Sequence, residues 1–99
     1  MILVYRVIIH AAAPEDEEAA LERVRAVLGA AGILASELRV EDGPDDARFL
    51  HIEAPLEAPS AYHAAHVSGP ELYGPLLAEA GLEQESLTLA ADRVSEPAA

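Results

Sequence analysis

The stretch I-L-V-Y-R-V-I-I-H, residues 2–10, decides the fold that we predict for this 99-residue chain. It is rich in β-branched residues and ends before a proline-containing turn, as strands do. Successive side chains of a strand point to opposite faces. One face takes Leu3, Tyr5, Val7 and Ile9, and the other takes Ile2, Val4, Arg6 and Ile8. Both sets are mainly aliphatic, so we expect both faces of this strand to be covered.

Residues 14–31 have the pattern of an amphipathic helix. Four acidic residues, 15–18, place negative charge at the positive end of the helix dipole. We interpret them as a solvent-facing first turn rather than as a metal or partner site. The apolar stripe consists of Leu21, Val24, Val27, Leu28 and Ala31. Gly32 is suited to the position that follows the helix.

A strand hairpin is predicted next. Residues 33–41 are predicted to form a strand with Ser36, Leu38 and Val40 on one face. Residues 42–46 form the loop, and residues 47–53 form the returning strand. The aspartates of the loop lack the spacing of an EF-hand calcium site. On the returning strand, Arg48, Leu50 and Ile52 face one side, and Phe49, His51 and Glu53 face the other. Residues 54–59 contain two prolines, and we interpret them as a connector.

The stretch A-Y-H-A-A-H-V-S-G-P-E-L-Y-G-P-L-L, residues 61–77, predicts a helix in two segments. Ser60 is a candidate cap for the first segment, and Ser68 with Glu71 has the spacing of a capping box. We expect a bend near residues 68–70. The buried side of the second segment is predicted to contain Leu72, Leu76 and Leu77, and Gly81 is predicted to end it.

A fourth strand is predicted over residues 86–94, with Leu87, Leu89 and Ala91 inward. Residues 96–99 are expected to form a disordered tail. The chain therefore reads as one domain, residues 1–95.

The element order, βαββαβ, predicts an α+β, ferredoxin-like fold: a four-stranded antiparallel sheet with two helices on one face. The helices leave the other face of the sheet uncovered. Because the first strand is apolar on both faces, we expect a second copy of the chain to pack there, sheet against sheet. A homodimer is the predicted partner arrangement.

The charge balance excludes several classes of partner. Six arginines stand against 18 acidic residues, which gives a formal net charge of −12. This charge disfavours nucleic acid and anionic membranes. The chain has no cysteine for disulfide or thiolate chemistry. Its longest apolar run is too short to span a bilayer and lacks the features of a signal peptide, so we expect a cytoplasmic protein.

Residues 45–77 resemble the antibiotic-biosynthesis monooxygenase-like family of dimeric α+β barrels. The resemblance rests on Asp46, Arg48-Phe49, Ile52-Glu53 and A-H-V-S-G-P-E-L, residues 65–72. The N-terminal strand and Ala31-Gly32 also fit. It implies a dimeric barrel that oxygenates a small electron-rich aromatic, such as a quinol or anthrone, without a metal or flavin cofactor.

The chain also departs from the family pattern. Pro55 stands where family members usually carry tryptophan, and the connector before His66 looks about two residues longer than the resemblance implies. The chain contains no asparagine, which disfavours the haem-degrading branch. Members without demonstrated activity are also known, so the fold does not by itself imply an enzyme.

A cofactor-free oxygenase needs a base, an apolar pocket and a partner for an oxyanion. His66 is the candidate base, because histidine titrates near neutral pH. His63 lies three residues before it on the same helix face. The candidate substrate-binding residues are Tyr62, Tyr73, Arg6 and Tyr5.

Each candidate also has a structural interpretation. His66 is equally suited to a backbone contact at the helix bend, and His63 and Tyr62 to surface packing. His51 is expected at the dimer face, His10 in solvent at a strand end, and Arg6 in a pair with Glu53. As a metal site, His63 and His66 lack a well-spaced third ligand.

Two functions therefore stand as hypotheses. The first is a cofactor-independent monooxygenase-like protein acting on a small aromatic substrate. The alternative is a non-catalytic small-molecule-binding or structural homodimer. A closed pocket lined by His66 and a tyrosine would favour the first, and a filled interior would favour the second.

Overall fold

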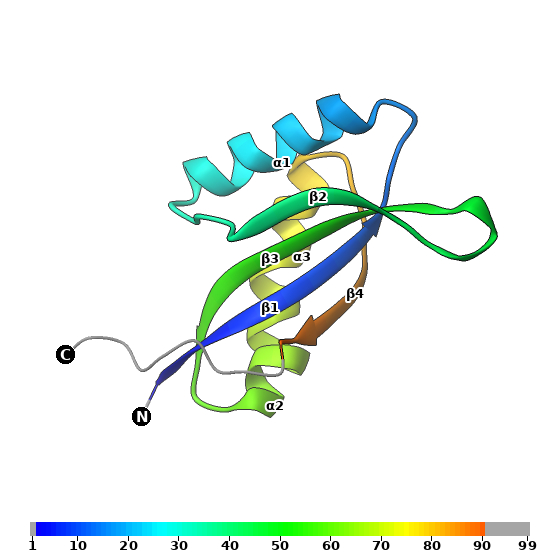
Figure 1. Cartoon of the computed structure of the whole chain (residues 1–99). Helices are drawn as coiled ribbons and strands as arrows, with labels where there is room; N and C mark the ends of the chain where they lie inside the picture. Colours follow the sequence, from blue (N-terminus) through cyan, green and yellow to red (C-terminus); the bar gives the residue numbers. More distant parts are fainter. Residues whose placement is uncertain (1, 91–99) are drawn as a thin grey trace.

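The computed structural model describes residues 2–90, in which four antiparallel strands form one sheet (Figure 1). The elements are β1 (Leu3–Ala12), α1 (Glu17–Ala30), β2 (Glu37–Asp42), the 3₁₀ turn η1 (Pro44–Asp46), β3 (Arg48–Ala58), α2 (Ala61–His63), the π-helical turn η2 (Ala64–Ser68), α3 (Gly69–Glu79) and β4 (Gln84–Leu89). The strand order is β2-β3-β1-β4. The predicted α+β class is confirmed, and the arrangement is compatible with a ferredoxin-like fold.

The core lies between the sheet and the helices. Figure 1 looks onto the sheet with α3 behind it. The β1–β3 register places Ile9 opposite Ile52, and the β1–β4 register places it opposite Leu87. Val24 and Leu28 of α1 and Leu77 of α3 are buried against this apolar layer. The other face of the sheet, called the open face below, is covered by no element among residues 2–90.

Both long helices end in the same backbone motif. Gly32 follows α1 with φ +76°, and Gly81 follows α3 with φ +78°. The N–H of Ile33 donates to the carbonyl of Leu28, and that of Leu82 donates to the carbonyl of Leu77. These are Schellman motifs, which need a left-handed residue that glycine adopts without strain. The predicted ends at Gly32 and Gly81 are confirmed. At its start, α1 is capped by Asp16 rather than beginning at Pro14.

Strand β3 is longer than predicted. The interpretation of residues 54–59 as a connector is wrong, because β3 continues to Ala58 and pairs with β1 as far as Leu3. Pro55 lies within this strand, opposite Arg6. Strand β2 pairs with β3 only up to Glu53, so Pro55 has a strand neighbour on one side only. A proline is tolerated there, because no ladder hydrogen bond depends on its missing N–H.

Residues 61–79 form one helical path with a π-turn inside it. Ser60 caps its start, as predicted, by accepting a hydrogen bond from the N–H of His63. Pro70 has no N–H to donate to the carbonyl of His66. In the turn before it, the N–H of Gly69 instead reaches the carbonyl of Ala64, five residues back, which makes the predicted bend a π-turn.

The buried side of α3 differs from the predicted one. Leu77 is buried and Leu76 is half-buried, but Leu72 is 39% exposed and Tyr73 takes the core position. Gly69, Tyr73 and Leu77 form the buried row, at intervals of four residues. The extra residue in the π-turn rotates the face that α3 presents to the sheet.

Gly69 sets the distance between α3 and β4. A Cβ at this position would lie 2.4 Å from the carbonyl oxygen of Ala64 and 2.8 Å from a methyl carbon of Leu87. Leu87 and Leu89 of β4 face the helices, as predicted. Ala91, the end of the predicted fourth strand and the predicted tail lie outside the described residues. No helix in residues 2–90 has the length and apolar character needed to cross a membrane.

Candidate functional site

Two of the tyrosines predicted to bind substrate are core residues. Tyr5 is 8% exposed and lies on the side of β1 that faces the helices. Tyr73 is fully buried, and its hydroxyl donates to the carbonyl oxygen of Pro55 at 2.5 Å. Burial raises the pKa of Tyr73 to about 12. Its one polar atom is therefore engaged in holding α3 to β3.

Arg6 lies on the opposite face of the sheet from these tyrosines. Its Nε is 3.3 Å from Oε1 of Glu53 on the neighbouring strand. The expected Arg6–Glu53 pair is therefore present. The alternation of β1 separates Arg6 from Tyr5, so these two do not line one pocket.

The two helical histidines have different surroundings. Nδ1 of His63 is 2.5 Å from Oγ of Ser68, within the helical path. His66 is exposed, and its ring lies 4.6 Å from that of Tyr62, which is 72% exposed. Ser68 thus contacts His63 instead of closing the predicted capping box with Glu71. His66 and Tyr62 form a surface pair next to the π-turn.

Within residues 2–90, three of the surface hollows have no histidine in their lining. The first, of 330 Å³, lies between the end of α1 and the start of β2; the second, of 270 Å³, lies on α1. The third, of 200 Å³, is lined by Arg6, Leu34, Ser36 and Pro55 at the edge of the open face. Arg6 is the one predicted site residue that borders any of them.

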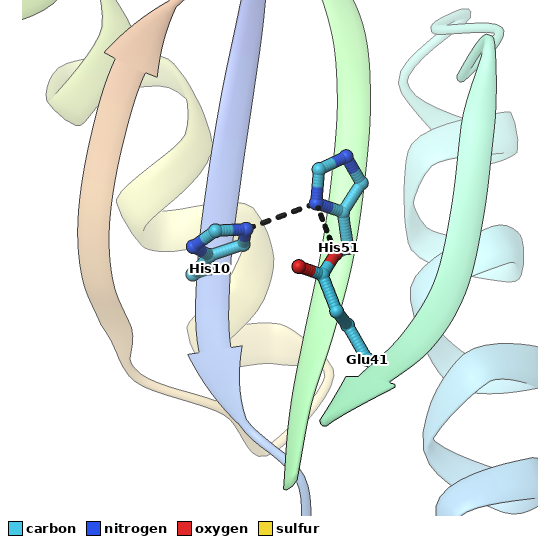
Figure 2. Close-up of side chains that lie close together, drawn as sticks. All are labelled: His10, Glu41 and His51. Carbon is cyan, nitrogen blue, oxygen red and sulfur yellow. Dashed lines mark hydrogen bonds and ion pairs between the residues drawn. The ribbon is translucent and has the colours of Figure 1, made fainter. Parts of the chain in front are cut away.

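A different group of titratable side chains meets on the open face (Figure 2). His10 of β1 lies directly opposite His51 of β3, and Glu41 of β2 reaches them from the next strand. Nε2 of His10 is 2.9 Å from Nδ1 of His51, which is 3.1 Å from Oε2 of Glu41. We call these three residues the His10–His51–Glu41 cluster. It joins three strands at one point of the sheet.

Glu53 orients the central histidine of this cluster. Nε2 of His51 is 2.9 Å from Oε2 of Glu53, so the Nε2–H donates to that carboxylate. The proton on Nε2 leaves the Nδ1 lone pair of neutral His51 directed at His10 and Glu41. Nδ1 of His51 therefore has two polar neighbours, Nε2 of His10 and the Glu41 carboxylate, which can only accept a hydrogen bond. A proton or a cation at this point would satisfy all three groups.

Ion pairs hold the surrounding carboxylates. The hydrogen bond with Glu37 lowers the pKa of Glu53, and the bond with His51 and the charge of Arg6 act in the same direction, against burial. Arg39 donates from Nη1 to Oε2 of Glu41 at 2.9 Å. Glu53 is thus held as a carboxylate beside His51.

The expectation for His10 is corrected, and the one for His51 at the dimer face stays a prediction. His10 was expected in solvent at a strand end, but β1 continues to Ala12 and leaves His10 half-buried beside Phe49, ring centres 6.2 Å apart. His51 lies on the expected face next to Phe49, yet it is 7% exposed in a single chain because its neighbours cover it. Its burial is therefore present without any partner.

The cluster was missed because its members are far apart in the sequence. His10 and His51 are separated by 41 positions. The alternation pattern already assigned His51 and Glu53 to one face, and in the predicted strand of residues 2–10 it places His10 on the same face as Arg6. Only the register brings the two histidines opposite each other.

Comparisons with family models, curated proteins and solved structures find no match to this chain.

Proposed function

We propose that this chain acts as a non-catalytic homodimer in which two copies pack through their open faces to form an α+β barrel. The observation that carries this proposal is the aliphatic row of Ile2, which precedes β1, with Val4 and Ile8 of β1, on either side of Arg6. Ile2 is 52% exposed, and Val4 and Ile8 are only half-buried. Water-exposed aliphatic side chains in a row favour association with another surface.

The size of the open face is compatible with a dimer. The strands have six to eleven residues. With a strand spacing of about 4.8 Å and a rise of about 3.3 Å per residue, the open face measures roughly 500 Å². Two such faces bury about 1,000 Å² together, the area that a specific interface needs at the least. A second copy is the occupant favoured here, because a face of this size suits an isologous contact in which each aliphatic row meets its counterpart.

The interior favours a structural role over enclosure of a substrate. The space between sheet and helices around Tyr73 is filled by buried side chains. The three hollows, of 200 to 330 Å³, lie at or below the small end of ligand pockets, about 300–1,000 Å³. The hollow beside Arg6 suits at most a small monocyclic ligand, and it borders the proposed interface.

Sedimentation velocity over micromolar concentrations tests the homodimer. Wild type is expected to sediment as a dimer that dissociates on dilution. Ile8→Glu buries a charge in the proposed interface and is expected to give monomers. Leu72→Glu, which introduces the same charge at an exposed leucine of α3, is the matched control and is expected to remain dimeric. A wild-type particle of 10.4 kDa at every concentration would overturn the proposal.

A second candidate is the cofactor-independent monooxygenase activity implied by the resemblance. It is favoured by the exposed His66 beside Tyr62 at a π-turn, since π-turns frequently occur at functional sites. In this mechanism His66 takes the proton of a quinol hydroxyl, and the resulting anion transfers an electron to dioxygen. The base would act at the surface of the helical path rather than in a closed pocket.

Oxygen uptake with model quinols tests this candidate. Wild type must exceed the autoxidation rate of the buffer blank, and His66→Ala is expected to lose that excess. His10→Ala serves as the matched control, because it removes a histidine from the opposite face. Equal rates for wild type and His66→Ala would remove His66 from the mechanism.

A further inference from the structure

We propose that the His10–His51–Glu41 cluster binds one divalent first-row transition-metal ion. The ligand atoms are Nε2 of His10, Nδ1 of His51 and Oε2 of Glu41, which lie within 4.8 Å of one another. Two imidazoles and one carboxylate are a donor set that suits zinc, iron or nickel rather than magnesium or calcium. This inference goes beyond the proposed homodimer and does not depend on it.

The spacing of these atoms fits a shared ion. For bonds of about 2.1 Å, two ligands lie about 3.0 Å apart at a right angle and about 3.3 Å apart at the tetrahedral angle. The observed separations around Nδ1 of His51 are 2.9 and 3.1 Å. These two separations need to widen by only a few tenths of an ångström to admit a metal, and the ligand atoms of His10 and Glu41 lie within 4.8 Å of each other. Three protein ligands also leave a coordination position open.

The residues around the cluster have the arrangement that metal-binding histidines use. The Nε2–H of His51 donates to Glu53, which fixes the tautomer whose Nδ1 is free to bind a cation. Arg6 holds Glu53 from its other side, at 3.3 Å. Arg39 fixes Oε2 of Glu41. His51 is thus oriented by a carboxylate that is itself held in place.

Charge around the cluster is balanced locally and is negative over the whole chain. Glu41 and the hydrogen-bonded Glu37–Glu53 pair, which shares one proton, face the two positive charges of Arg6 and Arg39. The formal net charge of the chain, −12, adds a long-range attraction for cations. Two imidazoles in the donor set select against the hard cations that acidic surfaces attract without specificity.

Isothermal titration of chelator-treated protein with Zn²⁺ tests the site. Wild type is expected to bind one Zn²⁺ per chain and to bind Mg²⁺ far more weakly. His10→Ala is expected to lose this binding, as is His51→Ala. Glu53→Gln keeps all three ligands and is expected to weaken Zn²⁺ binding by about 10- to 100-fold, because it alters only the group that orients His51.

The matched control is the double variant His63→Ala with His66→Ala. It removes two histidines from the helical path, as many as the proposed site contains, and is expected to bind Zn²⁺ like wild type. Circular dichroism checks that each variant is folded. If His51→Ala unfolds, Zn²⁺ binding by His10→Ala tests the site, because His10 is only half-buried. Co²⁺ gives a second readout, since its visible absorption is expected in wild type and absent in His10→Ala. Unchanged binding by His10→Ala, loss in the double variant, or equal affinity for Mg²⁺ would each overturn the site.

Discussion

Ile8 and Ile9 are neighbours of the same residue type on β1, but they have opposite surroundings. Ile9 is fully buried, between Ile52 and Leu87 on the face that the helices cover. Ile8 is half-buried, between Glu53 and Thr88 on the open face. Both suit a strand equally well, so strand propensity does not distinguish them. The difference between them arises from what packs over each face of the sheet.

The two faces also differ in how they treat polar groups. The helix-facing side is mainly aliphatic, and its polar groups include the hydroxyls of Tyr5 and Tyr73, the latter bonded to the Pro55 carbonyl. The open face collects histidines, carboxylates and arginines, and it buries His51 among them. One face is held together by aliphatic packing and the other by a hydrogen-bonded network.

The largest effect is expected from truncating Ile9. Ile9→Ala should lower the free energy of unfolding by about 2–5 kcal/mol, because it leaves a cavity in a closed core. Ile8→Ala should lower it by less than about 1 kcal/mol in dilute protein, where the open face is solvated. Urea titration of both variants gives the two values. Equal losses at low concentration would mean that the faces are equally covered.

The next effect concerns His51. His51→Ala removes a buried group that bonds Glu53, and it should lower the free energy of unfolding by about 1–3 kcal/mol. His66→Ala, in an exposed position, should change it by no more than about 0.5 kcal/mol. Urea unfolding at neutral pH compares them. A larger loss for His66→Ala would contradict the network described for the open face.

A smaller effect is expected from Tyr73→Phe, which should lower the free energy of unfolding by about 1 kcal/mol at neutral pH by leaving the Pro55 carbonyl without its donor. The pKa of Tyr73 is raised from 10.0 to about 12. Its contribution is therefore complete below pH 10 and is lost as pH rises from 10 through 12. The difference between wild type and Tyr73→Phe should shrink over that range in urea titrations. A difference independent of pH would mean that the buried hydroxyl titrates normally.

The smallest effect is the response of the proposed dimer to salt. Each copy carries a formal net charge of −12, so two copies repel one another while their aliphatic rows attract. Added salt screens the repulsion. The dimer dissociation constant should therefore fall a few-fold when the ionic strength is raised from about 0.1 M to about 1 M, which shortens the Debye length from about 10 Å to about 3 Å. Sedimentation equilibrium measures it. A constant that rises with salt would indicate an interface held by opposite charges.

Local signals predicted the elements well. The Schellman ends at Gly32 and Gly81 and the cap at Ser60 depend on a few adjacent residues, and each appears where the sequence placed it. The prediction of a connector at Pro55 was wrong because it rested on the local rule that proline breaks a strand. Whether a strand tolerates proline depends on its neighbours in the sheet, and β2 ends before reaching this position.

The histidines show the same limit for the candidate site. His63 and His66 are candidates from the sequence because they are three residues apart, yet one contacts Ser68 and the ring of the other lies tilted against that of Tyr62. His10 and His51 meet although 41 positions separate them. Their shared face follows from alternation, but their pairing follows from register, which depends on how β1 and β3 align.

The sequence by itself determined the order of strands and helices, the closed aliphatic face of the sheet and the helix ends, because these follow from periodicity and from the backbone preferences of single residues. Only the tertiary structure decided the extent of β3, the core position of Tyr73 and the meeting of His10, His51 and Glu41. Each of these depends on which strand lies beside which, and in what alignment. Such contacts join residues that no local pattern connects.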